Sequence, residues 1–564
     1  MKKGLNLLVI LVVMLFSLKV ESQSIVWYNV LAGQQEEYGN AICLDANHNV
    51  ITTGSFQDIC YGGSFGLFSS GLNDIFVQKT SPTGTVLWTQ QFGNGNSDNA
   101  FGLACDSLGN IYVSGTFLGT VYFGTNSLNS PISNSNFFVI KIAPNGDILW
   151  RKTIPGYSAH KPKLTVDNND NLFLTGVSGG TRNFGAFTID SDNGYGFVCK
   201  LNTASGNVIW VTQFGAGSSF NGTPVSNNIT TSNFIVDTLG NIFLTGCFIG
   251  HGRFGSQNII SSNSGSDTNA YLMKMSPTGT ILWTKFSTGK TEGTSIVLDQ
   301  FNNIYTAGNY FGQVSINNTT YNAPTDKYAI YLEKHDSEGN LIWFKHYDIN
   351  TTLHHEAIPQ LAIDKFSNLF FKCQLGFNST VAFENQTFNS LVGTNPNRYK
   401  TQLLASFNGN GDNLWVDQFE TFADNSQYGI WPDRANNIAV DETGLYFTSA
   451  NTLFDDVSHS LQSGANIFTA KLTLPYVLAN TGFDNAADRI SIVPNPTTGM
   501  LNIDLGNDYS DVEVNTYNSL GQQIGNKKFT NIKADTIDLT GDAGLYFIEI
   551  KTDRFKAIRK VIKF

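Results

Sequence analysis

The side chains of this sequence that could do chemistry are acidic residues repeated in short turns and a few less regular histidines and aromatics. Asp167-Asn-Asn-Asp170-Asn places several oxygen ligands in one turn, as calcium loops do. Each other copy of the turn carries a single Asp, whereas a calcium loop needs several carboxylates or carbonyls. We therefore expect the repeated Asp to accept N–H bonds within its own turn, and we predict neither a metal site nor a cofactor.

We predict no catalytic residue. The neighbouring side chains of His354-His355-Glu356 would point to opposite faces of a strand and chelate no common metal. Carboxylate pairs for glycoside cleavage would come from distant segments, so their separation is not readable from the sequence. Trp431, with Tyr428 nearby, lies outside the regular tryptophan spacing and is the aromatic we expect first to contact a ligand.

The composition indicates a folded protein that does not bind nucleic acid. Of 564 residues only 14% are charged, while 42 Phe and 21 Tyr supply large apolar surfaces for burial. The net charge is −11 and basic clusters are few, whereas binding a phosphate backbone needs patches of Lys and Arg.

The residues above are positioned by a repeat of roughly sixty residues that becomes plain when the chain is cut at its tryptophans. Each unit opens with a Trp: Trp27, Trp88, Trp150, Trp210, Trp283, Trp343 and Trp415. A strand-like run then ends in an Asp: Asp45, Asp106, Asp167, Asp237, Asp299, Asp364 and Asp441. A second run, a variable Gly- and Ser-rich excursion and a third run follow, and the third run ends in Lys79, Lys141, Lys200, Lys274, Lys334, Ser406 or Lys471.

Each unit therefore predicts four antiparallel strands, and seven such sheets bury their faces by packing around an axis as propeller blades. The chain opens with a Trp-bearing strand, and its last unit lacks one. We predict that the strand around Trp27 pairs with the strand around Lys471 and completes the seventh blade. The Trp residues are expected to pack between blades, and the recurring Lys to form a partly buried pair with the recurring Asp.

These motifs resemble the SBBP repeat of secreted bacterial seven-bladed β-propellers. The resemblance covers about Trp27 to Leu474 and is strongest for Asp106 to Phe117 and Asp237 to Phe248, whereas units six and seven have lost Gly-Asn-Ile-Tyr. It implies a scaffold with variable surface loops at 118–135, 214–232, 255–269 and 391–400, and it names no ligand.

The end of the chain resembles the type A sorting domain of cargo of the type IX (Por) secretion system. The resemblance rests on ordered motifs that contain Pro494, Asn495, Pro496, Gly499, Gly521, Gly544, Tyr546, Lys560 and Lys563. Six short strand-like runs between 489 and 564 predict a small Ig-like β-sandwich. The resemblance implies passage through the outer-membrane secretion machinery, with this domain as the address. Six Lys or Arg against one Asp in 551–564 are compatible with a recognition surface or with a solvated basic edge strand.

The start of the chain predicts export. Lys2 and Lys3 precede an apolar run too short to span a membrane, which is typical of a signal peptide cleaved between Ser22 and Gln23. We therefore expect a signal peptide (1–22), a propeller (23–474), a linker (475–488) and a sorting domain (489–564), and no membrane-spanning segment after cleavage.

The six cysteines show no metal-binding spacing, and Cys43, Cys105, Cys199 and Cys247 occupy apolar positions of strands. Only Cys43 and Cys60 are candidates for a local disulfide, which an oxidising compartment permits and the spacing does not require.

Taken together, the sequence predicts an all-β, secreted or surface-attached propeller with a separate sorting domain. The favoured function is non-enzymatic binding of an extracellular glycan or protein through blade loops. The alternatives are a polysaccharide lyase or glycoside hydrolase on the same scaffold, and a structural component of the envelope or an adhesin.

Overall fold

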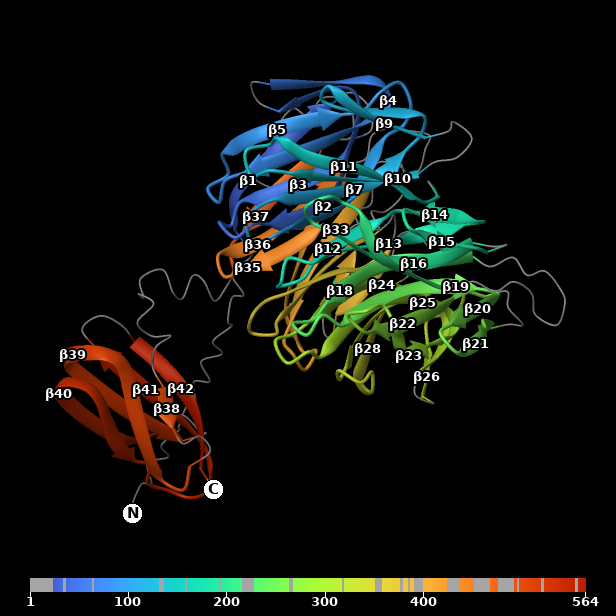
Figure 1. Ribbon diagram of the computed structural model, residues 1–564. Helices are drawn as coiled ribbons and strands as arrows, with labels where there is room; N and C mark the ends of the chain where they lie inside the picture. Colours follow the sequence, from blue (N-terminus) through green and yellow to red (C-terminus); the bar gives the residue numbers. More distant parts are fainter. Residues whose placement is uncertain are drawn as a thin grey trace, which may run out of the picture. The chain divides into compact units, whose positions relative to one another are not determined.

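The computed structural model describes residues 24–563 in two compact units, Met1–Leu474 and Pro475–Phe564, and all of its named elements, β1 to β42, are strands (Figure 1). The description omits residues 34–36, 63–64, 131–135, 158–159, 192–193, 216–227, 263–266, 317–318, 350–357, 376–378, 384–385, 390–398, 423–436, 451–466, 475–490, 494–496, 519–521 and 553–555.

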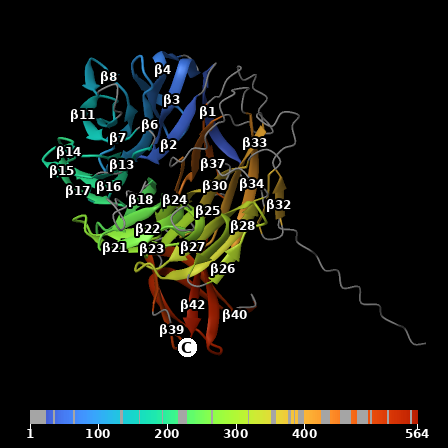
Figure 2. The same ribbon diagram turned by 90° about the vertical axis from the view of Figure 1, so that its right-hand side faces the viewer.

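The first unit is a ring of seven four-stranded antiparallel sheets, as the repeat predicts (Figures 1 and 2). Blade 1 consists of β2 (Tyr38–Leu44), β3 (Val50–Gly62), β4 (Phe65–Thr80) and β5 (Val86–Phe92), and blade 2 of β6 (Asn99–Cys105), β7 (Ile111–Phe117), β10 (Asn136–Ile142) and β11 (Ile148–Pro155). Blade 3 consists of β12 (Lys163–Val166), β13 (Leu172–Gly179), β16 (Gly194–Leu201) and β17 (Val208–Phe214), and blade 4 of β18 (Asn228–Val236), β19 (Ile242–Ile249), β22 (Asn269–Met275) and β23 (Ile281–Phe286). Blade 5 consists of β24 (Thr288–Leu298), β25 (Ile304–Ile316), β27 (Tyr328–His335) and β28 (Leu341–Ile349), and blade 6 of β29 (Gln360–Ile363), β30 (Leu369–Leu375), β33 (Tyr399–Phe407) and β34 (Asn413–Phe422). Blade 7 consists of β35 (Ile438–Asp441), β36 (Gly444–Ala450), β37 (Ile467–Leu472) and β1 (Ile25–Gly33).

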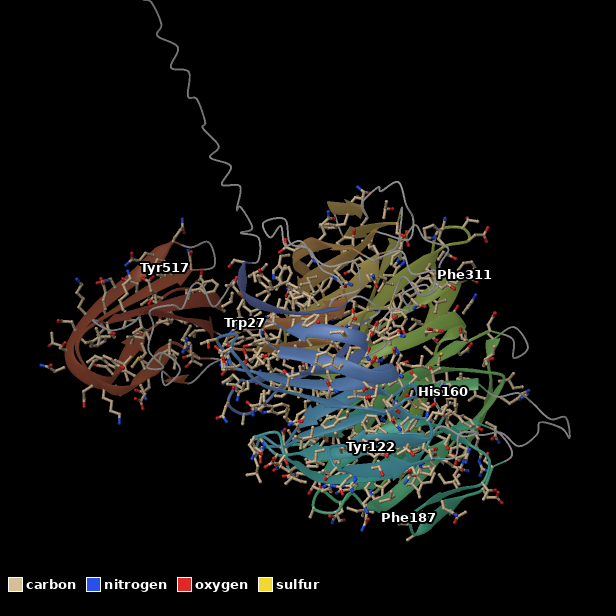
Figure 3. All side chains as sticks on the ribbon, turned by 90° about the horizontal axis from the view of Figure 1, so that it is seen from above. Trp27, Tyr122, His160, Phe187, Phe311 and Tyr517 are labelled. Carbon is tan, nitrogen blue, oxygen red and sulfur yellow. The ribbon has the colours of Figure 1, made fainter. Side chains whose placement is uncertain are left out.

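The seventh blade is completed by the first strand of the chain. β1 pairs with β37 in antiparallel register with Trp27 opposite Lys471, which is the pairing that the repeat phase predicts. The end of β1 also pairs with β3, where Gly33 lies opposite Cys60, so the seventh and first blades share one continuous sheet. Figure 3 labels Trp27 on this strand. The pairing gives both terminal strands hydrogen-bonded neighbours and leaves no open edge at the join.

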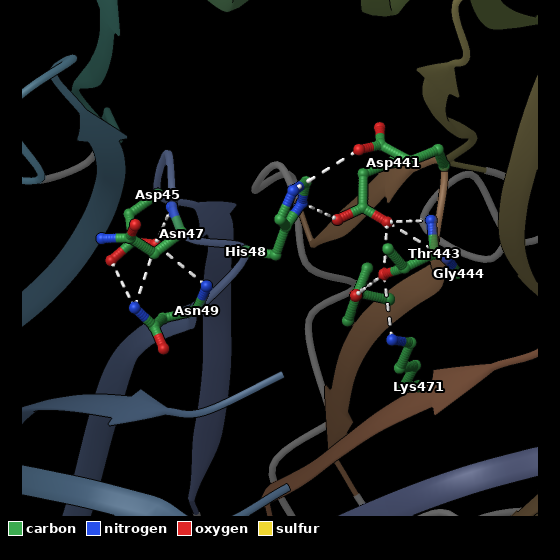
Figure 4. Close-up of polar contacts among 10 residues, drawn as sticks. Asp45, Asn47, His48, Asn49, Asp441, Thr443, Gly444 and Lys471 are labelled. Atoms are coloured by element: carbon green, nitrogen blue, oxygen red, sulfur yellow. Dashed lines mark hydrogen bonds and ion pairs between the residues drawn. The ribbon is translucent and has the colours of Figure 1, made fainter. Parts of the chain in front are cut away.

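The turns of the seventh and first blades are joined by a histidine (Figure 4). His48 Nδ1 lies 2.8 Å from Asp441 Oδ2, and His48 Nε2 lies 3.4 Å from Glu442 Oε1. A similar contact joins blades 2 and 3, where the backbone N–H of Ser107 donates to Asp170 Oδ1 at 2.8 Å. Side chains in the turns thus connect consecutive blades at one end of their first strands.

The apolar core fills the spaces between neighbouring blades. Between blades 1 and 2, for example, Ile75 and Val77 belong to one buried cluster with Ile140 and Ile142. Because both faces of these strands are covered, the second and third strands of a blade are buried over most of their length rather than alternating.

The Gly- and Ser-rich excursions contain small hairpins that the sequence analysis did not predict. They are β8 (Thr120–Phe123) with β9 (Asn126–Asn129), β14 (Arg182–Phe184) with β15 (Phe187–Ile189), β20 (His251–Phe254) with β21 (Gln257–Ile260), and β31 (Thr380–Phe383) with β32 (Gln386–Asn389), while β26 (Thr319–Asn322) pairs with β25. In the first three of these hairpins a buried Phe is followed by a Gly that turns the chain at positive φ: Phe123 and Gly124, Phe184 and Gly185, and Phe254 and Gly255. The excursions are therefore anchored at their tips.

The second unit is one five-stranded sheet of β38 (Ser491–Val493), β39 (Met500–Asn518), β40 (Gln523–Asp538), β41 (Gly544–Thr552) and β42 (Lys556–Lys563). Two of the expected short strands form a single long β39, with a register shift between Asp504 and Tyr509. The polar stretch 523–535 was not expected to be a strand, yet it pairs along β39 while its side chains remain mostly exposed. Its backbone pairing, rather than apolar alternation, accounts for its conformation.

Within the described residues, no helix has the length and apolar character to cross a membrane.

Candidate functional site

The motifs of the C-terminal unit meet at one end of its sheet. After the Pro494–Pro496 segment, the backbone N–H of Gly499 donates to Thr497 Oγ1 at 3.0 Å, and that hydroxyl donates to the carbonyl of Met500 at 2.8 Å. The carbonyl of Gly499 accepts a hydrogen bond from the N–H of Leu539 at 2.8 Å. The first motif is therefore joined to the segment that precedes β41.

The last lysine of the chain binds the same segment. Lys563 Nζ donates to the carbonyls of Leu539 at 2.7 Å and Gly541 at 2.8 Å, and Lys563 lies opposite Gly544 in the sheet. Tyr546, which is buried, donates its hydroxyl to the carbonyl of Asp542 at 2.6 Å. Four residues that were predicted as sorting residues from separate motifs thus lie around residues 539–542: Gly499, Gly544, Tyr546 and Lys563.

A second polar cluster lies on the paired strands β39 and β41. Glu549 Oε2 accepts hydrogen bonds from Asn515 Nδ2 at 3.0 Å and from the Tyr517 hydroxyl at 3.2 Å, and it pairs with Lys551 Nζ at 2.9 Å. Tyr517, labelled in Figure 3, opens the predicted motif that ends at Gly521 and Gln522. The hydrogen bonds and the Lys551 ion pair compensate the buried carboxylate of Glu549, which the sequence analysis did not single out.

In the propeller the repeated Asp organises its own turn, as predicted (Figure 4). Asp45 Oδ1 accepts the N–H groups of Asn47 and Asn49, both at 2.9 Å. The same pattern recurs with donors two and four residues after Asp106, Asp167, Asp237, Asp299 and Asp364. These carboxylates stabilise turns, so they are scaffold residues.

The expected Asp–Lys pair is present in some blades and replaced in others. Lys79 Nζ lies 2.9 Å from Asp45 Oδ2, and corresponding distances are 3.5 Å for Lys141 and Asp106 and 4.0 Å for Lys334 and Asp299. In the seventh blade the Lys471 ammonium instead donates to the Thr443 hydroxyl at 2.9 Å.

Four of the periodic tryptophans, Trp27, Trp88, Trp150 and Trp343, connect neighbouring blades through their indole nitrogens. Trp88 Nε1 and Lys79 Nζ both donate to the carbonyl of Pro144 in the next blade, at 3.1 and 3.4 Å. Trp150 with Lys141 and Trp343 with Lys334 do the same to Thr203 and Gly409. Trp27 Nε1 donates to the carbonyl of Pro82 at 2.9 Å. These Trp residues are therefore structural rather than free to stack on a ligand.

A polar cavity of about 180 Å³ lies between blades 4 and 5, and the strands that frame it can be followed in Figure 2. Its lining residues are Thr245, Ala270, Tyr271, Leu272, Lys285, Phe286, Ser287, Thr291, Val314, Ile316, Tyr331, Glu333, His335, Gly339, Asn340 and Leu341. This volume is several times the roughly 30 Å³ share of one water molecule in the liquid. The cavity therefore has room for a small polar group and not only for a single water.

Glu333 and His335 form the charged part of this cavity. Glu333 Oε1 accepts the Thr306 hydroxyl at 2.6 Å and lies 3.3 Å from His335 Nε2. Burial opposes ionisation of both groups, but their mutual attraction outweighs it, so the pKa of Glu333 is lowered and the pKa of His335 is raised. The contact between the two groups therefore favours the charged form of each.

The Glu333–His335 pair is a departure from the repeat. In blades 2, 3 and 4 the two corresponding positions before and after the recurring Lys are apolar: Ile140 and Ile142, Cys199 and Leu201, and Met273 and Met275. Aligning the repeat units of this sequence on their recurring Lys reveals this difference, but the sequence analysis did not make that comparison.

Comparison with known proteins decides the identity of the C-terminal unit. Residues 491–563 match the family model of the secretion system C-terminal sorting domain. The chain carries the sorting domain of type IX secretion cargo. This match confirms the sorting resemblance. The end of the sheet around residues 539–542, where several of the sorting motifs lie close together, is therefore the candidate sorting signal.

The cargo also matches known propeller sequences. Residues 87–116 match the family model of the beta-propeller repeat, which confirms the second resemblance. An uncharacterized WD repeat-containing protein of Acanthamoeba polyphaga mimivirus is 24% identical over 407 residues. The aligned region covers 57% of the cargo chain and 29% of the relative, so the chain spans less than a third of that protein's length.

Two solved structures of proteins of unknown function are similar to the cargo chain. The one from Bacteroides caccae is 11% identical with a TM-score of 0.31 and covers 70% of this chain and 94% of its own. The one from Dyadobacter fermentans is 9% identical with a TM-score of 0.33 and covers 66% and 93%. At these TM-scores neither adds to the assignment of the fold, which rests on the strand pairing.

Several predicted site residues lie outside the described residues of the cargo. They are Ser22, Gln23, Tyr428, Trp431, Pro494, Asn495, Pro496 and Gly521, together with the His354-His355-Glu356 triplet. Lys560 lies in β42 opposite Phe547 in β41.

All six cysteines are free thiols, and Cys43 is not bonded to Cys60. The pKa of the Cys43 thiol is raised well above its ordinary value by burial and by a hydrogen bond with Cys105 in the next blade. Among the described residues, no group of three or more His, Cys, Asp or Glu side chains is arranged to hold a metal ion.

Proposed function

We propose that this type IX cargo is a non-enzymatic propeller that acts outside the outer membrane, secreted or attached to the cell surface, and binds an extracellular glycan. The observation that carries the proposal is the polar cavity between blades 4 and 5, where a buried Glu–His pair replaces the apolar pairs of three other blades.

The chemistry of the cavity suits a sugar. Sugar hydroxyls both donate and accept hydrogen bonds, and the carboxylate of Glu333 can accept them while a ring N–H of His335 donates. Phe286 and Tyr331 add aromatic surface among the lining residues, and apolar sugar faces pack on such rings. The cavity volume of about 180 Å³ suits one sugar residue of a longer chain rather than several.

The lining also argues for binding rather than cleavage. Glycoside hydrolysis ordinarily uses two carboxyl groups flanking the scissile bond. Among the described residues that line this cavity, Glu333 is the only carboxylate, and it is already paired with His335. A lyase or hydrolase on this propeller would need a second acidic group that this cavity does not offer.

A glycan array tests the proposal with the full-length protein purified from the culture medium. We expect the wild-type protein to bind a defined set of glycans, and Glu333→Gln with His335→Gln to lose that binding at least tenfold. Glu338→Gln, which changes an exposed carboxylate in the next hairpin, serves as the control. Equal binding by the wild type and the double variant would contradict the proposal.

Incubation of the bound glycan with the protein separates binding from the enzymatic alternative. We expect the glycan to keep its chain length. Shortened products that disappear in the Glu333→Gln protein would refute a non-enzymatic role, and specific capture of a protein with no glycan bound would refute the choice of ligand class.

A further inference from the structure

Two carboxylates are buried together at the junction of blades 1 and 2, far in sequence from the polar cavity. Asp74 lies in β4 and is 1% exposed, and Asp98 lies just before β6 and is fully buried. Neither belongs to the Asp turns, and no step of the proposed function uses them.

The two side chains share one stretch of backbone. Asp98 Oδ2 accepts the N–H of Asn94 at 3.0 Å. A β-carbon built on the preceding residue, Gly93, would lie 2.1 Å from Asp74 Oδ1, so the Asp74 carboxylate lies directly over Gly93. Asp74 Oδ2 in turn accepts the N–H of Ser70 at 3.1 Å. Each carboxylate thus accepts a backbone N–H through its Oδ2, and the backbone of Leu118 also lowers the pKa of the Asp98 carboxyl by a hydrogen bond.

The other oxygen of each group has no partner in the part of the chain that the structure describes. Asp74 Oδ1 and Asp98 Oδ1 are both buried without a hydrogen bond. Burial raises the pKa of Asp74 to about 6 and, together with the nearby Asp74 charge, raises the pKa of Asp98 to about 8. Two buried carboxylates with unused oxygens lack the positive charge that such a site ordinarily contains.

The arrangement is specific to this junction. Counted back from the recurring Lys and Asp, the same two positions between blades 4 and 5 are Asn269 and Thr291. There Thr291 Oγ1 accepts the N–H of Ala270 at 2.8 Å, and Asn269 Nδ2 donates to the carbonyl of Ser287 at 2.7 Å. The neutral side chains at the junction of blades 4 and 5 therefore form hydrogen bonds with the backbone. Asp74 and Asp98, in contrast, each keep one buried oxygen without a hydrogen bond among the described residues.

We propose that Asp74 and Asp98 bind a calcium ion that joins blades 1 and 2. Calcium prefers oxygen ligands and tolerates irregular geometry, so two carboxylate oxygens are completed by backbone carbonyls and water. Among the described residues no third His, Cys, Asp or Glu joins the two carboxylates in a group arranged to hold a metal ion. The ion would be structural, and it is independent of the glycan cavity.

Calcium content and calcium-dependent stability test the site in the full-length protein. The protein is unfolded, stripped with EDTA and refolded with or without millimolar calcium, since the site is closed in the folded chain. We expect one calcium per chain after refolding and a thermal midpoint several degrees higher than in EDTA. Magnesium should give a smaller shift, because it demands a near-ideal octahedral site.

Variants distinguish an ion from a shared proton. Asp98→Asn should reduce the bound calcium to less than a tenth and abolish the calcium-dependent shift, while Asp147→Asn, at an exposed hairpin, should change neither. Should Asp98→Asn fail to fold, the wild-type calcium content still decides. Wild-type protein that refolds without bound calcium and with the same midpoint in calcium and EDTA would overturn the proposal in favour of a carboxyl pair sharing a proton.

Discussion

Trp27 in the first strand of the propeller lies opposite Lys471 in its last strand, in the register that joins Trp and Lys in other blades. Lys79 is opposite Trp88 and Lys141 is opposite Trp150, but the two members of each of these pairs come from consecutive strands of the chain. The Trp27–Lys471 pair reproduces them from the two ends of the domain. The ring is therefore closed by the same interaction that builds each blade.

Removing Trp27 should weaken this closure more than removing an exposed neighbour on the same strand. Trp27 packs on Tyr446 with ring centroids 6.3 Å apart and donates to Pro82, so we expect Trp27→Ala to lower the free energy of unfolding by about 3 kcal/mol. Val26 is 51% exposed, and Val26→Ala should cost less than about 0.5 kcal/mol. Urea unfolding monitored on the propeller transition measures both, and equal losses would argue against closure by Trp27.

Replacing Lys563 should reduce the stability and the secretion of the protein more than replacing an exposed lysine of the same domain does. Its ammonium binds the carbonyls of Leu539 and Gly541, and Lys563→Ala leaves both without their donor. We expect a loss of about 1–3 kcal/mol in stability and a several-fold fall in the amount of protein outside the cell. Lys533→Ala, at an exposed position of β40, is the matched control. Undiminished secretion of the Lys563→Ala protein would show that Lys563 is not part of the sorting signal.

The pH dependence of stability should report on Asp98. Its pKa is raised to about 8 by burial and by Asp74, so the folded chain binds this proton more tightly than the unfolded chain does. In calcium-free protein this group stabilises the fold at low pH, and the contribution is lost as the pH rises from about 4 toward 8. Asp98→Asn should flatten this part of the pH profile of the unfolding free energy. A profile unchanged by the substitution would show that Asp98 titrates normally.

The buried thiols should react slowly in the folded protein. Burial raises the pKa of Cys60, Cys199 and Cys373 well above the ordinary value, so little thiolate is present at neutral pH. We expect a thiol reagent to modify these residues only after denaturation, which then exposes six free thiols per chain. Peptide mapping that finds a disulfide between Cys43 and Cys60 would contradict this.

The sequence predicts the repeated parts of the molecule well because one pattern is written seven times. The Asp45 turn and the Trp27–Lys471 pairing follow from the spacing and phase of the repeat. The hairpin of β8 and β9 and the exposed strand β40 were missed, because the first lies in a variable segment and the second has no apolar alternation.

The sites were harder to predict because they depend on which residues meet across blades. Glu333 and His335 lie two positions apart on one strand, but the cavity that they line also needs residues of the neighbouring blade. Asp74 and Asp98 come from two blades and share no motif. Gly499, Tyr546 and Lys563 could be named from the family resemblance, whereas their meeting point at residues 539–542 required the sheet.

The central claim is that the C-terminal unit exports the propeller, and fractionation of cells that express the chain with and without residues 487–564 tests it most directly. We expect the full-length protein in the medium or on the cell surface and the truncated protein inside the cell envelope, with its propeller folded. Truncated protein that reaches the medium in the same amount as the full-length chain would contradict the account.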